Sequence, residues 1–588
     1  MTFLRELLAV ILGVFISFFI MFFVFVAVGS FISSSFMQED VVTVKDNSVL
    51  VLKLEDQIRD FAPKSDDPLE QLLGIDDQVM GLNTIINAID NAKYDEKISG
   101  ISIESLSLGA GIGQIQEIRD KLYEFKESGK FITAYADLYD QKNYYMSSVA
   151  DSIYVNPVGF LDLKGLSGEI LYFKDFQDKY GVRMEVIRHG KYKSAVEPFL
   201  ESEMSEANRE QTVAFLNSVW GELVEDMSEN RGLTPEKINS IADDLGARTP
   251  DMALEQGIVS GQMYRDDYRN VLKELVGIGE DKKLNLLSIK NYIKSGKGRI
   301  ASTAKDRIAV IYAQGEIIYG KGDERFVGQD LMIESLREAK EAKDIKAIVL
   351  RVNSPGGSAL ASDIIWREIE LTKKEKPVVV SMGSYATSGG YYISCNADKI
   401  VAEPTTITGS IGVFGIIPNI SEFSDRIGIN AEQIGTNRQS VGYSIFEPMP
   451  DAFYAVTKEG VERVYSNFVT KVAEGRNMTF EQVDSIAQGR VWTGKEALSK
   501  GLVDQLGSLE DAVRVAADMV EISEYRIRNY PDYDKEFKDL FKGPFSNVKQ
   551  SLIEDELGET TYEAYQKIRT INSLKGIQTR LPFLLEIR

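Results

Sequence analysis

Apolar residues in the second half of the chain form short β-branched runs separated by a helical pattern. The runs begin at Arg307 ("RIAVIYAQGEI"), Ile345 ("IKAIVLRVNSPGG") and Lys376 ("KPVVVSMGSYA"), and turn residues bound them. Such runs are typical of buried strands. Between the first two, the segment "DLMIESLREAKEAKD" from Asp330 repeats its apolar residues at helical spacing. Strands that alternate with helices predict βαβ units and an α/β fold with parallel strands.

The chain contains an internal duplication. The segment "YYMSSVADSIYVNP" from Tyr144 matches "YYISCNADKIVAEP" from Tyr391, which begins 247 residues later. The same offset relates "ISGISI" to "IKAIVL" and aligns three glycines further along. This match predicts two homologous α/β domains, a first repeat over residues 45–300 and a second repeat over 305–520. Residues 521–588 lie outside the duplication, and their charged pattern predicts a helical C-terminal extension.

The N-terminal segment is a long apolar run. No charged residue occurs from Leu7 to Gln38, and a helix of this length crosses the roughly 30 Å hydrocarbon core of a membrane. Signal-peptide cores are shorter, about 7–15 residues. We therefore expect residues 1–38 to be an uncleaved transmembrane anchor, with a cleaved signal peptide as the alternative. Arg5 favours an inside N-terminus, which places the rest of the chain outside.

Composition limits the chemistry that this chain performs. The net charge of −22 argues against a nucleic-acid partner, because proteins that bind nucleic acids carry basic surfaces. The single cysteine, Cys395, cannot form an internal disulfide or a multi-cysteine metal site. The single histidine, His189, leaves little for zinc ligation. We therefore expect no metal and no cofactor.

A serine and two glycine elements follow the predicted strands. Ser388 comes after the strand that ends near Val380, and Gly389 then opens a predicted helix whose first N–H groups are free to face an anion. Gly356 and Gly357 follow the preceding strand and allow a ligand to approach the backbone. Each element has a simpler interpretation, a helix N-cap for the serine and a plain turn for the glycine pair. Together they lie where open α/β sheets bind ligands.

Four motifs carry a specific family resemblance. The combination of "NSPGGS", "ATSGGYYIS" and "TGSIGVFG" with "GKYKSAVEPF" in the first repeat resembles the long form of bacterial signal peptide peptidase A. The resemblance implies two tandem Clp-protease/crotonase-like domains that form a serine endopeptidase. It implies Ser388 as nucleophile, Lys193 as general base and Ser410 as the residue that orients the lysine amine.

The resemblance also implies a substrate and a location. We expect remnant signal peptides and other hydrophobic peptides as substrates, and a homo-oligomer, a tetramer in the family. We expect a single-pass protein of the bacterial cytoplasmic (inner) membrane, with its catalytic domains on the periplasmic face.

The duplication supports a single shared site. The position equivalent to Ser388 in the first repeat is Gln141, and the position equivalent to Lys193 in the second repeat is Ser440. Each repeat therefore keeps one half of a serine–lysine dyad. The backbone N–H groups of three glycines are the candidates for an oxyanion hole. They are Gly356, Gly357 and Gly389.

A lysine base has to be neutral to accept a proton. Because the ordinary lysine pKa is about 10.4, burial must lower it to about 7–8. The residues alone do not distinguish Lys193 from Lys191, and Glu197 would oppose the shift if its carboxylate faced the amine. Three alternatives remain open. They are a Ser–His enzyme that uses His189, a crotonase-type enzyme acting on acyl-CoA, and a non-catalytic membrane scaffold of the same fold.

Overall fold

The computed structural model describes residues 42–63, 79–298, 302–533 and 577–580, together with residues 13, 16–21, 23 and 24. Most of the predicted anchor, 1–38, therefore lies outside the described residues. Those of its residues that are described are helical and exposed. Within the described ranges, no helix is both long enough and apolar enough to cross a membrane.

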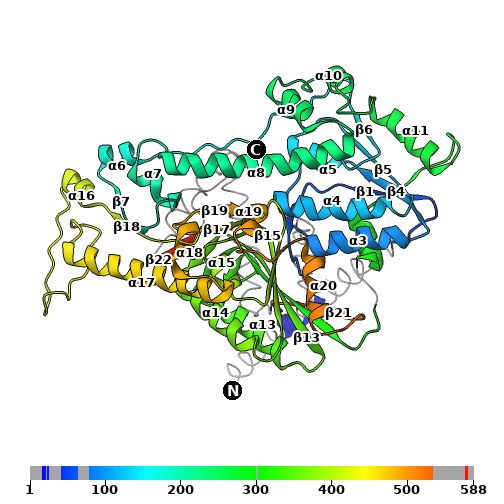
Figure 1. Cartoon of the computed structure of the whole chain (residues 1–588). Coiled ribbons are helices and arrows are strands. Elements are labelled where there is room, and N and C mark those ends of the chain that lie inside the picture. Colours follow the sequence, from blue (N-terminus) through cyan, green and yellow to red (C-terminus); the bar gives the residue numbers. More distant parts are fainter. Residues whose placement is uncertain are drawn as a thin grey trace, which may run out of the picture.

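The first repeat forms a six-stranded parallel sheet (Figure 1). In sheet order its strands are β8 (Gly261–Gln262), β6 (Ser152–Val155), β5 (Phe131–Ala136), β4 (Ile98–Ile103), β1 (Ser48–Leu52) and β9 (Asn285–Ser288). A short separate parallel pair is formed by β2 (Gln57–Arg59) and β3 (Val79–Gly81). The helices are α3 (Leu82–Tyr94), α4 (Ile112–Lys126), α5 (Gln141–Ser147), α6 (Lys174–Tyr180), α7 (Glu197–Leu200), α8 (Glu206–Arg231), α9 (Pro235–Asp243), α10 (Pro250–Glu255), α11 (Arg265–Val276) and α12 (Ile289–Tyr292).

The second repeat forms an eight-stranded sheet that contains the three predicted runs as neighbouring parallel strands. Along its main path the strands are β19 (Val491–Thr493), β17 (Ile407–Gly409), β15 (Val378–Thr387), β13 (Ile345–Ser354), β10 (Arg307–Gln314) and β21 (Arg526–Tyr530). Off this path, β16 (Lys399–Ala402) pairs with β15, and β20 (Gln505–Leu506) pairs with β16. The helices are α13 (Gln329–Glu341), α14 (Ala359–Thr372), α15 (Gly389–Ser394), α16 (Ser421–Ile427), α17 (Asp451–Arg476), α18 (Phe480–Ile486), α19 (Gly494–Ser499) and α20 (Leu509–Met519). The predicted α/β fold is confirmed.

The C-terminal extension corrects one expectation. Helix was predicted from residue 521, but Arg526–Tyr530 forms β21, a parallel strand on the edge of β10. This segment is a strand because of a tertiary contact: it pairs with the open edge of β10, and Tyr530 is buried against the core. A second strand, β22 (Ile577–Arg580), also replaces predicted helix. The other residues beyond Tyr533 lie outside the described ranges.

A third sheet joins the two repeats and the C-terminal segment. In order its strands are β12 (Phe326–Gly328), β11 (Glu316–Ile318), β14 (Gly356–Ser358), β22, β18 (Val413–Asn419) and β7 (Arg183–His189). β7 comes from the first repeat and pairs antiparallel with β18 of the second. Figure 1 shows α8 of the first repeat extending across the second, where it packs beside β19. This exchange brings the loop after β7 to the second repeat.

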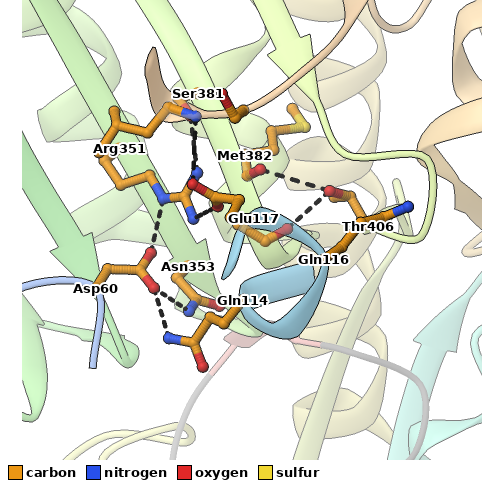
Figure 2. A network of polar contacts seen from close by, with 12 residues as sticks. Asp60, Gln114, Gln116, Glu117, Arg351, Asn353, Ser381, Met382 and Thr406 are labelled. Atoms are coloured by element: carbon orange, nitrogen blue, oxygen red, sulfur yellow. Dashed lines mark hydrogen bonds and ion pairs between the residues drawn. The ribbon is translucent and has the colours of Figure 1, made fainter. Parts of the chain in front are cut away.

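A buried polar network also joins the repeats (Figure 2). The Arg351 guanidinium, fully buried on β13, donates to Asp60 Oδ2 at 2.7 Å and also bonds Glu117 on α4. Asp60 Oδ1 accepts from Gln114 on α4 at 2.6 Å and from Asn353 on β13 at 3.1 Å. Buried charges are tolerated only when they are paired and hydrogen-bonded. The network therefore fixes α4 of the first repeat against the strand that leads to Gly356.

Candidate active site

Ser388 lies at the junction of β15 and α15. Its backbone has φ 54° and ψ −110°, a conformation that costs a non-glycine residue about 1–3 kcal/mol. The N–H of Ser388 donates to Gly409 O at 2.8 Å, which fixes the turn. The side chain makes no capping hydrogen bond to α15. Ser388 is therefore not an ordinary N-cap, and its hydroxyl is left to face the loop after β7.

Lys193 lies in that loop and is fully buried. Its Nζ lies 2.9 Å from Ser388 Oγ, 2.9 Å from Ser410 Oγ and 3.1 Å from Ser410 O. The structure thus brings together, within one chain, the three side chains that the sequence singled out. Ser410 itself has φ 51°, so both serines occupy a sparsely populated backbone region.

The surroundings of Lys193 favour a neutral amine. Burial lowers its pKa well below the ordinary lysine value, and no carboxylate opposes that shift. The Glu197 carboxylate instead accepts a hydrogen bond from Asn208 at 2.6 Å. The centroid of the Phe414 ring lies 6.0 Å from Nζ. An amine without its proton at neutral pH is able to act as a base.

The other candidate bases point elsewhere. Lys191 is exposed and its Nζ lies 3.5 Å from the hydroxyl of Tyr192. His189 Nδ1 lies 2.6 Å from Glu462 Oε2, and the imidazole stacks on the Tyr465 ring. Ser388 Oγ therefore has Lys193 beside it rather than either of these residues.

A segment of the second repeat that sequence reasoning missed holds Lys193 in place. Tyr192 N donates to Gln488 O at 2.8 Å, while Ser410 N donates to Arg490 O at 2.7 Å. Gly489 lies between them, and a Cβ on this residue would come within 2.6 Å of Lys193 N. Gly489 also has φ 80°, which suits glycine. No local sequence signal could identify this contact, because it joins segments almost 300 residues apart.

The glycine candidates for the oxyanion hole lie beside Ser388. Gly356 and Gly357 begin β14 directly after β13, and Gly356 N donates to Ser354 Oγ at 3.2 Å. Gly389 opens α15, and a Cβ on the next residue, Gly390, would lie 2.8 Å from Ser354 O. Ser388 and β14 are therefore neighbours. The use of these amides by an oxyanion stays a prediction.

The arrangement suits acyl transfer by a serine. A strained hydroxyl, a buried amine and nearby backbone amides are the parts that a nucleophile, a base and an oxyanion site require. Cys395, the single thiol, is buried, and burial raises its pKa to about 12, so it is no nucleophile at neutral pH. Across the described ranges, no group of three or more His, Cys, Asp and Glu residues is placed to hold a metal ion.

Comparison with known proteins agrees with this chemistry. The fold and its relatives define a serine-type peptidase of the α/β class. The model of Peptidase family S49 matches residues 124–279 and again 370–523, once in each repeat, and the chain belongs to this family.

Two of the relatives are called Protease 4. The one from Haemophilus influenzae is 37% identical over 494 residues, which is 82% of this chain and 79% of the relative. The one from Salmonella typhi is 37% identical over 77% of this chain and 74% of its own.

More remote proteins also match. The chloroplastic serine protease SPPA of Arabidopsis thaliana is 33% identical over 82% of this chain and 70% of its own. Among solved structures, a ClpP1 mutant from Listeria monocytogenes matches 35% of this chain and 94% of its own at 17% identity. Its TM-score of 0.24 is too low to support an argument.

Proposed function

We propose that this chain is a membrane-anchored endopeptidase that uses a Ser388–Lys193 dyad, built by two Clp-protease/crotonase-like repeats. The observation that carries the proposal is the 2.9 Å separation of Lys193 Nζ and Ser388 Oγ, in a position where both residues are fully buried. The same amine contacts Ser410 through Oγ and the carbonyl oxygen, which fixes its direction.

The chemistry follows from these contacts. Neutral Lys193 removes the Ser388 proton as Oγ attacks the peptide carbonyl carbon, and backbone N–H groups near Gly357 and Gly389 stabilise the oxyanion. The resulting ammonium then gives its proton to the leaving amine, and an acyl-enzyme remains on Ser388. A water molecule, deprotonated by the same amine, releases the acyl group. Ser410 keeps the amine beside Oγ through both steps.

The proposed substrates are remnant signal peptides and other hydrophobic peptides, cut on the periplasmic face of the bacterial inner membrane. Two observations support this: the charge-free run from Leu7 to Gln38 and the family resemblance of the site motifs. An enzyme held at the membrane meets such peptides where they are released.

A homo-oligomer, a tetramer by family resemblance, is part of the proposal. Large apolar side chains are exposed on the projecting region that follows β18. They include Ile427 at 53%, Ile434 at 93% and Val456 at 69% exposure. Contiguous exposed apolar surface is typical of regions that contact another protein, and these side chains are candidates for such a surface.

One experiment tests the proposal directly. The full-length protein in detergent is treated with a fluorophosphonate probe, and the labelled peptide is located by mass spectrometry. We expect label on Ser388 and cleavage of apolar peptides from a synthetic library. The matched control is Ser384→Ala, because Ser384 is buried four residues earlier on β15 and keeps the active-site contacts intact. Label on another residue, or labelling without any peptide cleavage, would contradict the proposal.

A further inference from the structure

The loop that carries Lys193 is held by a glutamine on α8. Gln211 Nε2 donates to Ser194 Oγ at 2.6 Å and to Tyr192 O at 3.0 Å, so it contacts both residues that flank Lys193. Ser194 Oγ in turn donates to Tyr192 O at 3.0 Å, which closes a small ring of hydrogen bonds. Gln211 and Ser194 are both buried, so bulk water does not compete for these contacts. One side chain thus holds both neighbours of the proposed base.

A carboxylate sets the direction of this amide. Asn208 Nδ2 donates to Glu197 Oε2 at 2.6 Å, and Asn208 Oδ1 accepts from Gln211 Nε2 at 3.2 Å. Because an ionised carboxylate only accepts hydrogen bonds, Asn208 has to turn its amino group toward Glu197 and its oxygen toward Gln211. Gln211 then faces the oxygens of Asn208 and Tyr192 and has to present its own amino group. The two amides therefore have one polarity, which Glu197 sets.

The amide oxygen of Gln211 indicates that this residue gives the loop direction rather than stability. Gln211 Oε1 is buried and has no hydrogen-bond partner among the residues that the structure describes. A buried oxygen without a partner costs free energy of folding, and an apolar side chain of the same size would avoid that cost. Tyr192 O also has other donors, the N–H group and the hydroxyl of Ser194. The fold therefore gains little from Gln211, whereas the direction of the lysine loop depends on it.

The equivalent helix of the second repeat has no such amides. α8 and α17 are each 26 residues long. Counted from the first residue of each helix, Gln211 corresponds to Val456, which is 69% exposed, and Asn208 corresponds to Phe453. The second repeat also has no lysine at the position equivalent to Lys193. The pair of amides thus occurs in the repeat that carries the proposed base.

We propose that Gln211 is a positioning residue for Lys193, the proposed base. Glu197 acts through Asn208 to set the direction of the Gln211 amide. This inference rests on the proposed function of the dyad. The Lys193 amine lies at the end of a flexible four-carbon stem, so a small turn of the main chain moves Nζ away from Ser388 Oγ. Holding the loop therefore keeps the amine within reach of the serine.

The test replaces the amide with an apolar side chain of similar length. Gln211→Met removes both N–H donors, and Gln177→Met is the matched control. Gln177 is also buried, and its amide also bonds main-chain atoms, Phe199 O and Met184 N, but none in the lysine loop. We expect Gln211→Met to lower kcat for a short apolar peptide about 10- to 100-fold, because a displacement of about 1 Å in an active site costs about 100-fold in rate. KM should stay within about threefold, and Gln177→Met should keep both constants within about threefold.

The pH profile shows whether Gln211 acts through the amine. Burial lowers the pKa of Lys193, and a loosened loop admits water to the amine, so this pKa rises toward the ordinary value of about 10.4. The rising limb of kcat/KM should therefore move to higher pH in Gln211→Met, and the loss of activity should shrink at alkaline pH. A loss of the same size at every pH would overturn the proposal, because Gln211 would then have a structural role alone. A change confined to KM would overturn it as well.

A second variant tests the carboxylate that sets the polarity. Glu197→Gln keeps the shape of the side chain, but its amide can face Asn208 in either orientation, so the polarity is no longer fixed. The rising limb should again move to higher pH, by less than in Gln211→Met. Loss of the negative charge alone could only move the limb to lower pH, because a nearby carboxylate raises the pKa of a lysine. A shift to lower pH would therefore overturn the role of Glu197, and this variant decides the question even if Gln211→Met does not fold.

Hydrogen exchange separates this inference from the proposed function. In the Ser388→Ala background, Gln211→Met should exchange the amides of residues 190–194 faster than Gln177→Met does. This readout needs no catalysis. If the unmodified chain cleaves no peptide, the proposed function fails, while exchange still decides whether Gln211 holds the loop. Unchanged exchange in residues 190–194 would show that it does not.

Discussion

The two repeats differ most at the position of the proposed nucleophile. In the second repeat this position is Ser388, in strained backbone beside a buried amine. In the first repeat it is Gln141, whose side chain bonds the loop at Lys164 and Gly165, accepting from their N–H groups at 3.1 and 2.9 Å. That loop is equivalent to residues 411 and 412, next to Ser410. In the first repeat, hydrogen bonds of the neutral Gln141 side chain thus fill this space. In the second repeat, the equivalent space beside Ser388 holds the Lys193 amine.

The strands around the site show the same division. β7 of the first repeat and β18 of the second form a regular antiparallel pair. Their equivalents, residues 430–436 and 166–172, form no strand. Each repeat therefore contributes one strand, and the two strands pair with each other across the repeats. The proposed site is thus built from different parts of the two copies.

The largest expected effect comes from the dyad. Ser388→Ala and Lys193→Ala should each lower kcat/KM for a peptide by about four orders of magnitude or more, because a nucleophile and its base act as a unit. Substitutions at the equivalent positions, Gln141→Ala and Ser440→Ala, should keep catalysis within about threefold. Steady-state assays of the four variants test the comparison.

Mixing the two inactive variants sharpens this test. Because Lys193 and Ser388 meet within one chain, co-assembled Ser388→Ala and Lys193→Ala subunits should recover no activity. Substantial recovery would mean that the working dyad forms across a subunit interface.

The next effect is on the contact between the repeats. Asp60→Ala leaves the buried Arg351 guanidinium without one of its two carboxylates, and should lower the free energy of unfolding by about 3–5 kcal/mol. Denaturant unfolding of the detergent-solubilised protein measures it. The matched control is Asp56→Ala, which removes a half-exposed ion pair with Lys290 worth about 0–1 kcal/mol. Equal losses in both variants would mean that the network does not stabilise the interface.

A smaller effect is expected at the segment that holds Lys193. Gly489→Ala places a Cβ 2.6 Å from Lys193 N, so the lysine has to move. A displacement of about 1 Å in an active site costs about 100-fold in rate. Gly442→Ala is the control, because Gly442 also has positive φ but no neighbour within 4 Å of its Cβ position. If the two variants retain equal activity, the contact has no role in catalysis.

The sequence predicted the parts of the fold that leave a local pattern or an internal repeat in the chain. The β-branched runs at 307, 345 and 376 are parallel neighbours in one sheet. In agreement with the duplication, the model of one family matches the chain twice, once in each repeat. The pairing of Ser388 with Lys193 followed from motif resemblance and complementary loss, and the structure has the two side chains in contact. Their catalytic roles stay predictions. No local pattern could reveal Gly489 or the Arg351 network, because both depend on contacts between distant segments.

Two short parts of the C-terminal extension, Arg526–Tyr530 and Ile577–Arg580, were mispredicted for a related reason. The charged, apparently helical pattern of the extension is a local signal, whereas β21 and β22 exist because other strands leave edges open to them. Strand formation on an existing edge depends on the partner more than on the added segment. Sequence reading was therefore weakest where one segment completes a surface formed by others.

The smallest expected effect is on the pH dependence of stability. Burial lowers the pKa of Lys193 in the folded protein, while the unfolded lysine keeps a pKa of about 10.4. Between these two values the unfolded chain binds a proton that the folded chain does not. The free energy of unfolding should therefore rise with pH in this window, by up to about 1.4 kcal/mol per pH unit.

Substitution isolates the contribution of Lys193. The slope should disappear in Lys193→Met, which keeps the length of the side chain without the amine, and persist in Lys191→Met, because Lys191 is exposed. Denaturant unfolding at several pH values below 10.4 measures the slope. The same deprotonation should make kcat/KM of the unmodified chain rise with pH and level off above the lowered pKa of Lys193. If the slope survives in Lys193→Met, another group causes it. The buried Lys193 amine of the unmodified folded protein would then be charged. The first repeat serves as a comparison within the same chain. At the position equivalent to Ser388 it has Gln141, which is uncharged at every pH and should contribute nothing to this slope.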